Sequence, residues 1–286
     1  MFRATLLGLA LAGASAGTAQ TAGDGALAQI EAMDRAAAQV RDYTMTLVKQ
    51  ERLLGRLEAP QTFLIKFARP QSTYVKNIQG DTPGQEAIYV PGWNRDRLRA
   101  HKGSFPDFNL NLDPLGSLAM SRSHHPITEG SLLHLVELIS SNVREGLRRG
   151  EGSLRRVGTE TLWGRPVVKL EGDSPPVFES DTVRPGETLW DVARRTGRGM
   201  YLLLHSNLDR GWRRAGDARV GEPVRVPRYY AGRLVLWLDA ESHLPLRAEI
   251  YDHKAQLYEL YEHRELRVNV GLGPEEFDPG NKAYRF

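Results

Sequence analysis

Short segments of alternating apolar and polar residues dominate the chain and most constrain its fold. Side chains along a strand point alternately to its two faces, so Phe63, Ile65 and Phe67 share one face. Turn-forming residues such as Pro91 and Gly92 separate the segments. The pattern predicts an antiparallel meander with strands at residues 43–53, 62–68, 73–79, 86–91, 96–101, 154–162, 166–171, 233–239, 246–252 and 256–262, and an optional last strand at 266–270.

Two other segments follow the spacing of amphipathic helices. Residues 25–41 carry one apolar side, and residues 131–148 do so again, with Gly150 placed to end the second helix. A sheet and helices that each have one apolar face bury these faces against each other. We therefore predict an α+β fold, in which a curved antiparallel sheet, a half-barrel, packs on amphipathic helices.

The N-terminus has the composition of a secretory signal peptide. Arg3 precedes an apolar run from Leu6 to Ala12, and the sequence Ala14-Ser15-Ala16 is a candidate cleavage site. A membrane span needs about 20 apolar residues, so we expect no transmembrane segment in the mature chain. We assign residues 1–19 to the signal peptide and expect a periplasmic, cell-wall associated protein that is secreted across the inner membrane.

Composition and motifs give little support to an enzyme. The chain of 286 residues has no cysteine and a formal net charge of +3, which is too weak to suggest a nucleic-acid partner. His124, His125 and His134 lack the spacing of a metal site, so we expect structural or solvent-exposed roles for them, and neither metal nor cofactor. The 35 Asp and Glu residues leave a carboxylate-based glycan hydrolase open as an alternative.

Residues 175–228 interrupt the strand pattern. Within the stretch VRPGETLWDVARRTG, Pro185 and Gly186 form a turn, Thr188 begins a helix with Asp191 as its capping partner, and Gly197 ends it. A second short helix and a closing strand follow. The predicted order is strand, helix, helix, strand.

The segments TVRPGETLWDVARRTG, YLLLHSNLD and VGEPVRVP resemble the LysM domain, a small module that binds N-acetylglucosamine-containing glycans such as peptidoglycan. Leu208 replaces a usual proline, and the loop at residues 209–219 is long and basic. Trp212 in that loop either stacks on a sugar or packs on its own module. The resemblance implies a glycan-binding groove lined by Gly186, Glu187, Thr188 and Leu189 on one side and Asn207, Leu208 and Asp209 on the other.

The remaining sequence resembles secreted bacterial domains of unknown function, which are similar to periplasmic lipoprotein carriers and lipoprotein-sorting proteins. The resemblance rests on YTMTLVKQE, FLIKFARPQSTYVKNIQG, GQEAIYVPGWNRDRLRAHKG and LWLDAESHLPLRAEIYD. In the carriers a half-open barrel encloses a pocket for acyl chains. The alternative is a barrel filled by its own side chains. The resemblance implies an apolar cavity, for which we expect the lining residues Phe63, Ile65, Phe67, Leu234, Leu236 and Leu238.

These inferences define the domains and the functional hypotheses. A LysM domain at 177–228 is inserted into a carrier-like domain made of 24–174 and 229–286. We predict that strands 166–171 and 233–239 pair directly, and that the host folds without the insertion. The leading hypothesis is a non-enzymatic envelope protein that binds peptidoglycan through the module and a lipid, a lipoprotein acyl chain or another apolar ligand through the sheet domain. The alternatives are a cell-wall glycan hydrolase and a structural protein without a ligand cavity.

Overall fold

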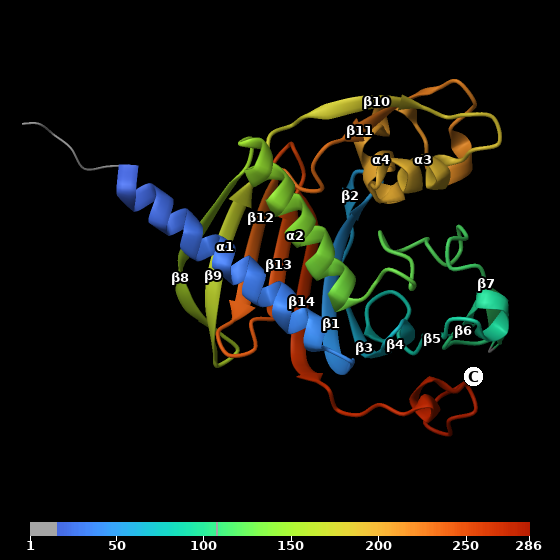
Figure 1. Cartoon of the computed structure of the whole chain (residues 1–286). Helices are drawn as coiled ribbons and strands as arrows, with labels where there is room; N and C mark the ends of the chain where they lie inside the picture. Colours follow the sequence, from blue (N-terminus) through green and yellow to red (C-terminus); the bar gives the residue numbers. More distant parts are fainter. Residues whose placement is uncertain (1–15, 107) are drawn as a thin grey trace, which may run out of the picture.

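A computed structural model describes residues 16–106 and 108–286, so most of the expected signal peptide lies outside the described residues. One 12-stranded antiparallel sheet dominates (Figure 1), with strand order β7-β6-β5-β4-β3-β1-β14-β13-β12-β9-β8 and with β2 paired to β1. Its strands are β1 (Asp42–Leu53), β2 (Arg56–Leu57), β3 (Gln61–Ala68), β4 (Ser72–Gln79), β5 (Glu86–Tyr89), β6 (Leu98–His101), β7 (Asn109–Leu112), β8 (Ser153–Leu162), β9 (Arg165–Asp173), β12 (Arg233–Asp239), β13 (Pro245–Tyr251) and β14 (Leu257–Val268).

The sheet confirms the antiparallel meander and differs from the prediction in detail. Strands β2 and β7 were not predicted, and β14 is one continuous strand where the sequence suggested two. Strands β9 and β12 pair directly, with Leu170 opposite Leu236, which confirms the predicted pairing across the insertion. The two ends of the sheet, β7 and β8, lie far apart in Figure 1, so the curved sheet is not closed into a barrel.

Two helices, α1 (Ala16–Gln39) and α2 (Leu132–Arg149), lie across the concave face of the sheet (Figure 1). Helix α2 begins and ends as predicted, because the Ser131 hydroxyl accepts a hydrogen bond from the His134 amide and Gly150 adopts a left-handed conformation. Helix α1 begins well before residue 25. Both helices turn their apolar stripes to the sheet, and the main core includes Ile30, Met33, Leu132, Leu135, Val136, Ile139, Leu170, Leu234, Leu236 and Leu238.

The segment after β9 forms a small module with its own core. It contains β10 (Phe178–Thr182), α3 (Leu189–Thr196), α4 (Met200–Ser206) and β11 (Pro223–Pro227), in the predicted order, and β10 pairs with β11 in a separate two-stranded sheet. Trp212 is buried in this core, as expected for an aromatic residue that packs on its own module. The shorter 3₁₀ helices of the chain are η1 (Trp93–Asp96), η2 (Leu208–Arg210), η3 (Ala215–Asp217) and η4 (Pro274–Phe277).

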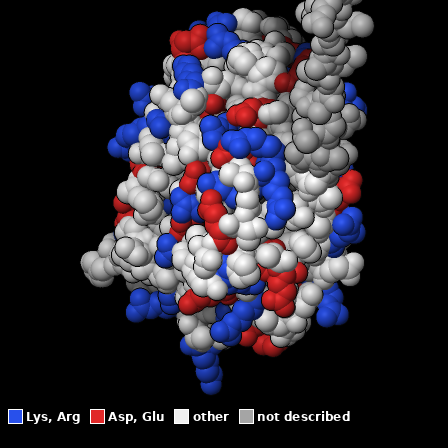
Figure 2. Space-filling model, turned by 90° about the vertical axis from the view of Figure 1, so that its left-hand side faces the viewer, with Lys and Arg blue, Asp and Glu red and all other residues white. Residues whose placement is uncertain are grey.

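The outer surface of the sheet differs between its two ends. Phe277 and Tyr284 of the C-terminal segment pack against Tyr74 and Ile88 of β4 and β5, with the rings of Tyr74 and Tyr284 stacked at 4.0 Å. Figure 2, seen from the β8 side, instead shows basic and acidic side chains interspersed, without a large patch of one sign. Within the described residues, no helix is both long enough and apolar enough to cross a membrane.

Candidate ligand-binding site

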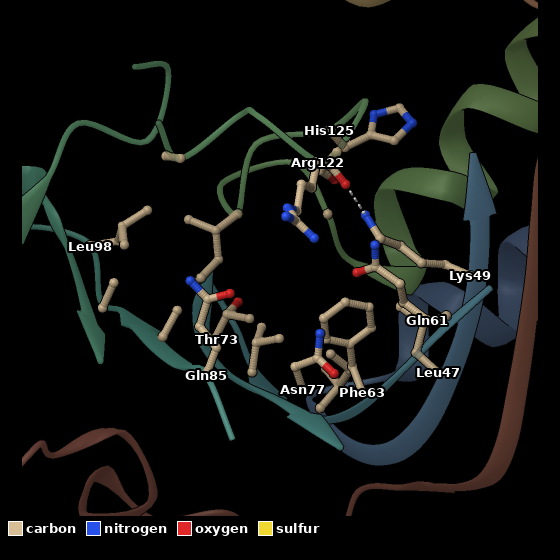
Figure 3. Close-up of a pocket in the computed structure, with 18 of the residues that line it drawn as sticks. Leu47, Lys49, Gln61, Phe63, Thr73, Asn77, Gln85, Leu98, Arg122 and His125 are labelled. Carbon is tan, nitrogen blue, oxygen red and sulfur yellow. Dashed lines mark hydrogen bonds between the residues drawn. The ribbon is translucent and has the colours of Figure 1, made fainter. Parts of the chain in front are cut away.

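A cavity of about 610 Å³ lies between the concave side of β1 and β3 to β7, the start of α2 and the covering segment of residues 113–131 (Figure 3). Helices α1 and α2 fill the concave face over the other half of the sheet. Residues 113–131 cover this half without a regular helix, so they fill the concavity incompletely. Apolar residues predominate in the lining, among them Met45, Leu47, Phe63, Ile65, Val75, Leu98, Leu112, Leu118, Ile127, Leu132 and Leu135.

Three basic residues of the lining, Lys49, Arg122 and His125, lie together at the covering segment, whereas the polar residues Thr73, Asn77 and Gln85 lie on the sheet (Figure 3). Arg122 and His125 come from the covering segment, and in Figure 3 they lie opposite Phe63 and Asn77 of the sheet. Lys49 of β1 donates a hydrogen bond to the carbonyl oxygen of Arg122 at 2.9 Å, which ties the covering segment to the sheet. The cavity can therefore contact an apolar chain and a polar group of the same ligand.

The six residues expected to line an apolar pocket separate into two sets. Phe63 and Ile65 line the cavity, whereas Phe67 stacks on Tyr43 at 4.9 Å and belongs to the main core. The β12 residues Leu234, Leu236 and Leu238 do not line the cavity and lie in the main core, so this part of the prediction needs correction. Helices α1 and α2 pack on the concave face over β12, so its inward-facing leucines are buried against the helices and do not reach the cavity.

Two buried carboxylates lie beside the polar side of the cavity, and the sequence analysis missed them. Glu51 of β1 and Glu259 of β14 are directly opposite in the strand register and are 3% and 0% exposed. Like charges at such a pair are unfavourable, and burial adds a desolvation cost. Both carboxylates therefore require hydrogen-bond donors and positively charged groups close by.

Histidines and a tyrosine surround Glu259. His124 Nδ1 lies 2.6 Å and His125 Nε2 lies 3.3 Å from Glu259 Oε1, while the Tyr230 hydroxyl donates to Oε2 at 2.5 Å. His124 Nε2 lies 3.0 Å from the carbonyl oxygen of Arg52, so both of its nitrogens face acceptors.

Glu51 has its own set of donors. Tyr261 donates to Oε1 at 2.7 Å, and Lys49 Nζ and the backbone amide of His124 lie 3.0 and 3.1 Å from Oε2. The side chains of Lys49 and Glu51 continue the inward-facing series of Met45 and Leu47 along β1. A charged pair at inward positions of a strand is the sequence feature from which this cluster could have been inferred.

The pKa directions agree with an ionised cluster. Burial alone would raise the pKa of Glu259, but hydrogen bonds and positive charge from His124 and His125 hold it well below its usual range. Burial would lower the pKa of His125, yet its hydrogen bond to Glu259 and the nearby carboxylate charges raise it. Burial and the neighbouring His125 lower the pKa of His134 to about 4, so this cavity residue is neutral at pH 7.

None of these groups forms a metal site. Across residues 16–286 other than 107, no group of three or more His, Asp or Glu side chains is arranged to hold a metal ion. His124 instead stacks on Tyr258 at 4.3 Å between ring centroids. The arrangement is a buried network of charge and hydrogen bonds that forms part of the cavity wall.

The same network contacts the small module. The Tyr201 hydroxyl of α4 donates to the carbonyl oxygen of Met120 at 2.6 Å, and its ring lies 5.7 Å from that of His124. His205 Nε2 lies 2.9 Å from Asp252 Oδ2, and Leu202 packs in the main core of the sheet domain. The module is therefore docked on the sheet domain through α4, and does not behave as a freely attached unit.

The seven residues expected at a glycan groove lie on two sides of the module. Gly186 is exposed with a φ of 81°, and Thr188 and Asp191 form the predicted capping box. Glu187 pairs with Arg195 at 2.9 Å, while Leu189 is buried in the module core. The first side of the expected groove therefore offers an exposed turn and backbone groups.

The second side of the expected groove, at residues 207–209, offers fewer accessible groups. Asn207 is buried, and its amide donates to the carbonyl oxygens of Leu203 and Arg225, each at 2.8 Å. Asp209 is exposed and pairs with Arg225 at 3.3 Å. Leu208 lies against the turn between β1 and β2: its Cδ1 is 3.3 Å from the position that a Cβ on Gly55 would occupy. On this side only Asp209 is exposed, and Arg225 already pairs with its carboxylate.

Residues 40–200 and 202–286 match the family described as "Protein of unknown function (DUF1571)". The chain belongs to this family. The expected membership of a family of unknown function is thus confirmed, and the matched residues include both the large sheet and the small module. No curated protein matches the sequence.

Solved structures give remote likenesses. Lipoprotein LppX of Mycobacterium tuberculosis is 17% identical with a TM-score of 0.42, over 89% of this chain and 99% of that chain. A DUF1329 family protein from Desulfovibrio piger is 13% identical with a TM-score of 0.38, over 92% and 99%. A putative outer membrane lipoprotein-sorting protein domain from Vibrio parahaemolyticus is 12% identical with a TM-score of 0.32, over 90% and 97%. Because these TM-scores are below 0.5, the proposals below rest on the geometry of this chain.

Proposed function

We propose that this chain is a non-enzymatic protein of the bacterial cell envelope that binds the apolar part of an amphiphile in its cavity. The observation that carries the proposal is the cavity of about 610 Å³, which lies within the usual range of roughly 300 to 1,000 Å³ for ligand sites. A structural protein with a filled interior would not need such a space. The third hypothesis from the sequence is therefore the least favoured.

The proposed ligand has one acyl chain or a similar apolar chain and one polar group. The chain lies against Phe63, Ile65 and Val75 of the sheet, and the polar group lies near Arg122 and His125. The mainly apolar lining and the group of basic residues at the covering segment favour this orientation, because burial of a polar group against an apolar surface is costly.

A fluorescent fatty acid tests the proposal in solution. Val75→Trp adds a bulky ring on the cavity side of β4 and should abolish saturable binding. Leu64→Trp is the matched control, because Leu64 points to the outer face of β3 and is 41% exposed. Equal binding by both variants, or no saturable binding by the wild type, would overturn the proposal. Circular dichroism of both variants checks that they fold.

The hydrolase alternative receives no support from the buried carboxylates. A glycosidase needs one carboxylic acid that stays protonated, and such a group has a raised pKa. The pKa values of Glu51 and Glu259 are both lowered, by Lys49 and His124 for the first and by His124 and His125 for the second, against the opposing effect of burial. Neither residue is then a proton donor near neutral pH, which favours binding over hydrolysis.

We further propose that the module binds peptidoglycan or a similar glycan, which would keep the secreted protein at the cell wall. The exposed turn at Pro185 and Gly186 supports this, together with the basic loop that carries Arg210, Arg213 and Arg214. The full chain should co-sediment with insoluble peptidoglycan and be released by soluble N-acetylglucosamine oligomers. Release by moderate salt alone, without an effect of the oligomers, would reduce the module to a basic surface.

A further inference from the structure

The mouth of the cavity has an apolar rim on its solvent side. Leu118, Phe108 and Leu110 line the cavity and are also 60%, 42% and 37% exposed, and nearby Phe105 is 94% exposed. Large apolar side chains are normally scattered singly on the surface of a soluble protein. Here they are continuous with the interior of the cavity, so the apolar surface extends from the binding site to the solvent.

Basic residues accompany this rim. Residues 93–105 contain the basic residues Arg95, Arg97, Arg99 and Lys102 and a single acidic residue, Asp96. Lys102 Nζ lies 5.4 Å from the ring centroid of Phe108. The Asn94 side chain donates to Asn111 Oδ1 of β7 at 3.0 Å, which holds the turn that carries Arg95 and Arg97 at the edge of the sheet, on the face opposite the cavity, because Asn111 alternates with the cavity-lining Leu110 and Leu112. Trp93 begins this turn and is 37% exposed.

We propose that this rim, formed by Phe105, Phe108, Leu110 and Leu118 with the cations of residues 95–102, docks the cavity mouth on a bilayer that contains anionic lipids. Aromatic and aliphatic side chains insert at the interface between water and the acyl region, while Lys and Arg attract anionic head groups. The inference rests on the proposed function, because an amphiphile that is poorly soluble in water must be exchanged with a membrane. The β6–β7 end of the sheet is the part of the molecule that would face the bilayer (Figure 1).

Co-sedimentation of the full chain with lipid vesicles tests the inference. Binding should be strong to vesicles of phosphatidylcholine mixed with phosphatidylglycerol, and weak to vesicles of phosphatidylcholine alone. The variant Phe105→Ser/Leu118→Ser should reduce the partition coefficient by roughly tenfold or more, since two inserted apolar side chains are lost. Val220→Ser is the matched control, because Val220 of the small module is 58% exposed and should leave binding unchanged.

The charge contribution has a separate control. Arg95→Gln and Arg97→Gln should each lower binding to the anionic vesicles by about fivefold. Arg156→Gln removes an exposed cation from β8, at the opposite edge of the sheet, and should have no effect. Equal losses for these three variants would show a response to net charge alone and would overturn the proposed orientation.

The outcomes separate this inference from the proposed function. Val75→Trp fills the cavity without changing the rim, so it should still bind anionic vesicles while it no longer binds the soluble fatty acid. If the wild type binds the fatty acid but not the vesicles, the docking surface is refuted and the cavity remains. If the rim variants bind vesicles as the wild type does, the rim contacts something else, such as a protein partner, and the inference fails.

Discussion

Replacing Glu259 by glutamine tests whether the buried network stabilises the cavity wall. The side chain is fully buried and accepts from His124, His125 and Tyr230. Glutamine has nearly the same shape but only one acceptor oxygen, and its amide group would face one of these donors. Removing one partner from a buried charged group costs about 3 to 5 kcal/mol in free energy of unfolding. We expect a loss of this size in urea denaturation at neutral pH.

The pH dependence of the same variant gives a second, independent readout. The pKa of Glu259 is lowered from an ordinary value of 4.5, so its contribution is present above pH 4.5 and is lost as the pH falls through the folded-state pKa. The pKa of His125 is raised from 6.5, so its contribution is present below pH 6.5 and is lost as the pH rises through its folded-state pKa. The wild type should therefore be most stable between these values. Glu259→Gln should have a flatter profile on both sides.

A matched control lies three residues along the same strand. Glu262 is itself only 6% exposed, but it pairs on the outer face with Arg247 and Arg264, whose side chains are 27% and 48% exposed and keep the ion pairs in contact with solvent. Because such partly exposed pairs contribute up to about 1 kcal/mol, Glu262→Gln should cost much less. A loss below about 1 kcal/mol for Glu259→Gln, or an equal loss for both variants, would refute the proposed network.

Three further predictions concern packing and the module. Leu202→Ala should lower the free energy of unfolding by about 2 to 5 kcal/mol, because this module residue packs in the core of the sheet domain. A loss below about 1 kcal/mol in urea denaturation would contradict the docking of the module on the sheet domain. Gly103→Ala should lower the melting temperature far more than Gly92→Ala. Both glycines have a φ of 77°, so the backbone strain is similar. Only at position 103 would the added Cβ overlap backbone, because it would lie 2.2 Å from the Gly84 carbonyl carbon. Gly186→Val should weaken co-sedimentation with peptidoglycan, because it strains a turn with a φ of 81°; unchanged sedimentation would place the glycan contact elsewhere.

The sequence predicts much of the fold because the relevant information is local. Alternation along strands and the apolar stripe and caps of α2 depend on residues within a few positions of one another. The capping box of Thr188 and Asp191 is predicted for the same reason. Strand β2 was missed because it is only 2 residues long and gives too short a pattern. Strand β7 has the alternating sequence NLNL and is as long as β5 and β6, so the same pattern could have predicted it.

Apart from the inward-facing pair Lys49 and Glu51 of β1, the site depends on contacts between residues that are distant in the sequence. Glu51 and Glu259 become neighbours only through the register of two strands that are distant in the sequence. Likewise, Phe63 and Leu236 have the same alternating pattern, yet one faces the cavity and the other lies in the main core. The module illustrates the same limit, since Leu202 and Tyr201 dock it on the sheet domain. Removal of the insertion should therefore destabilise the host, contrary to the expectation from the sequence.

The most direct test of the central claim is to map where an amphiphile binds. A fatty acid with a photoreactive diazirine on its acyl chain, crosslinked to the full chain and located by peptide mass spectrometry, should label β3 and β4 and the covering segment of residues 113–131. An excess of unlabelled fatty acid should suppress this labelling. Labelling of β12, around Leu234 to Leu238, or labelling that the competitor does not suppress, would contradict a binding site in this cavity.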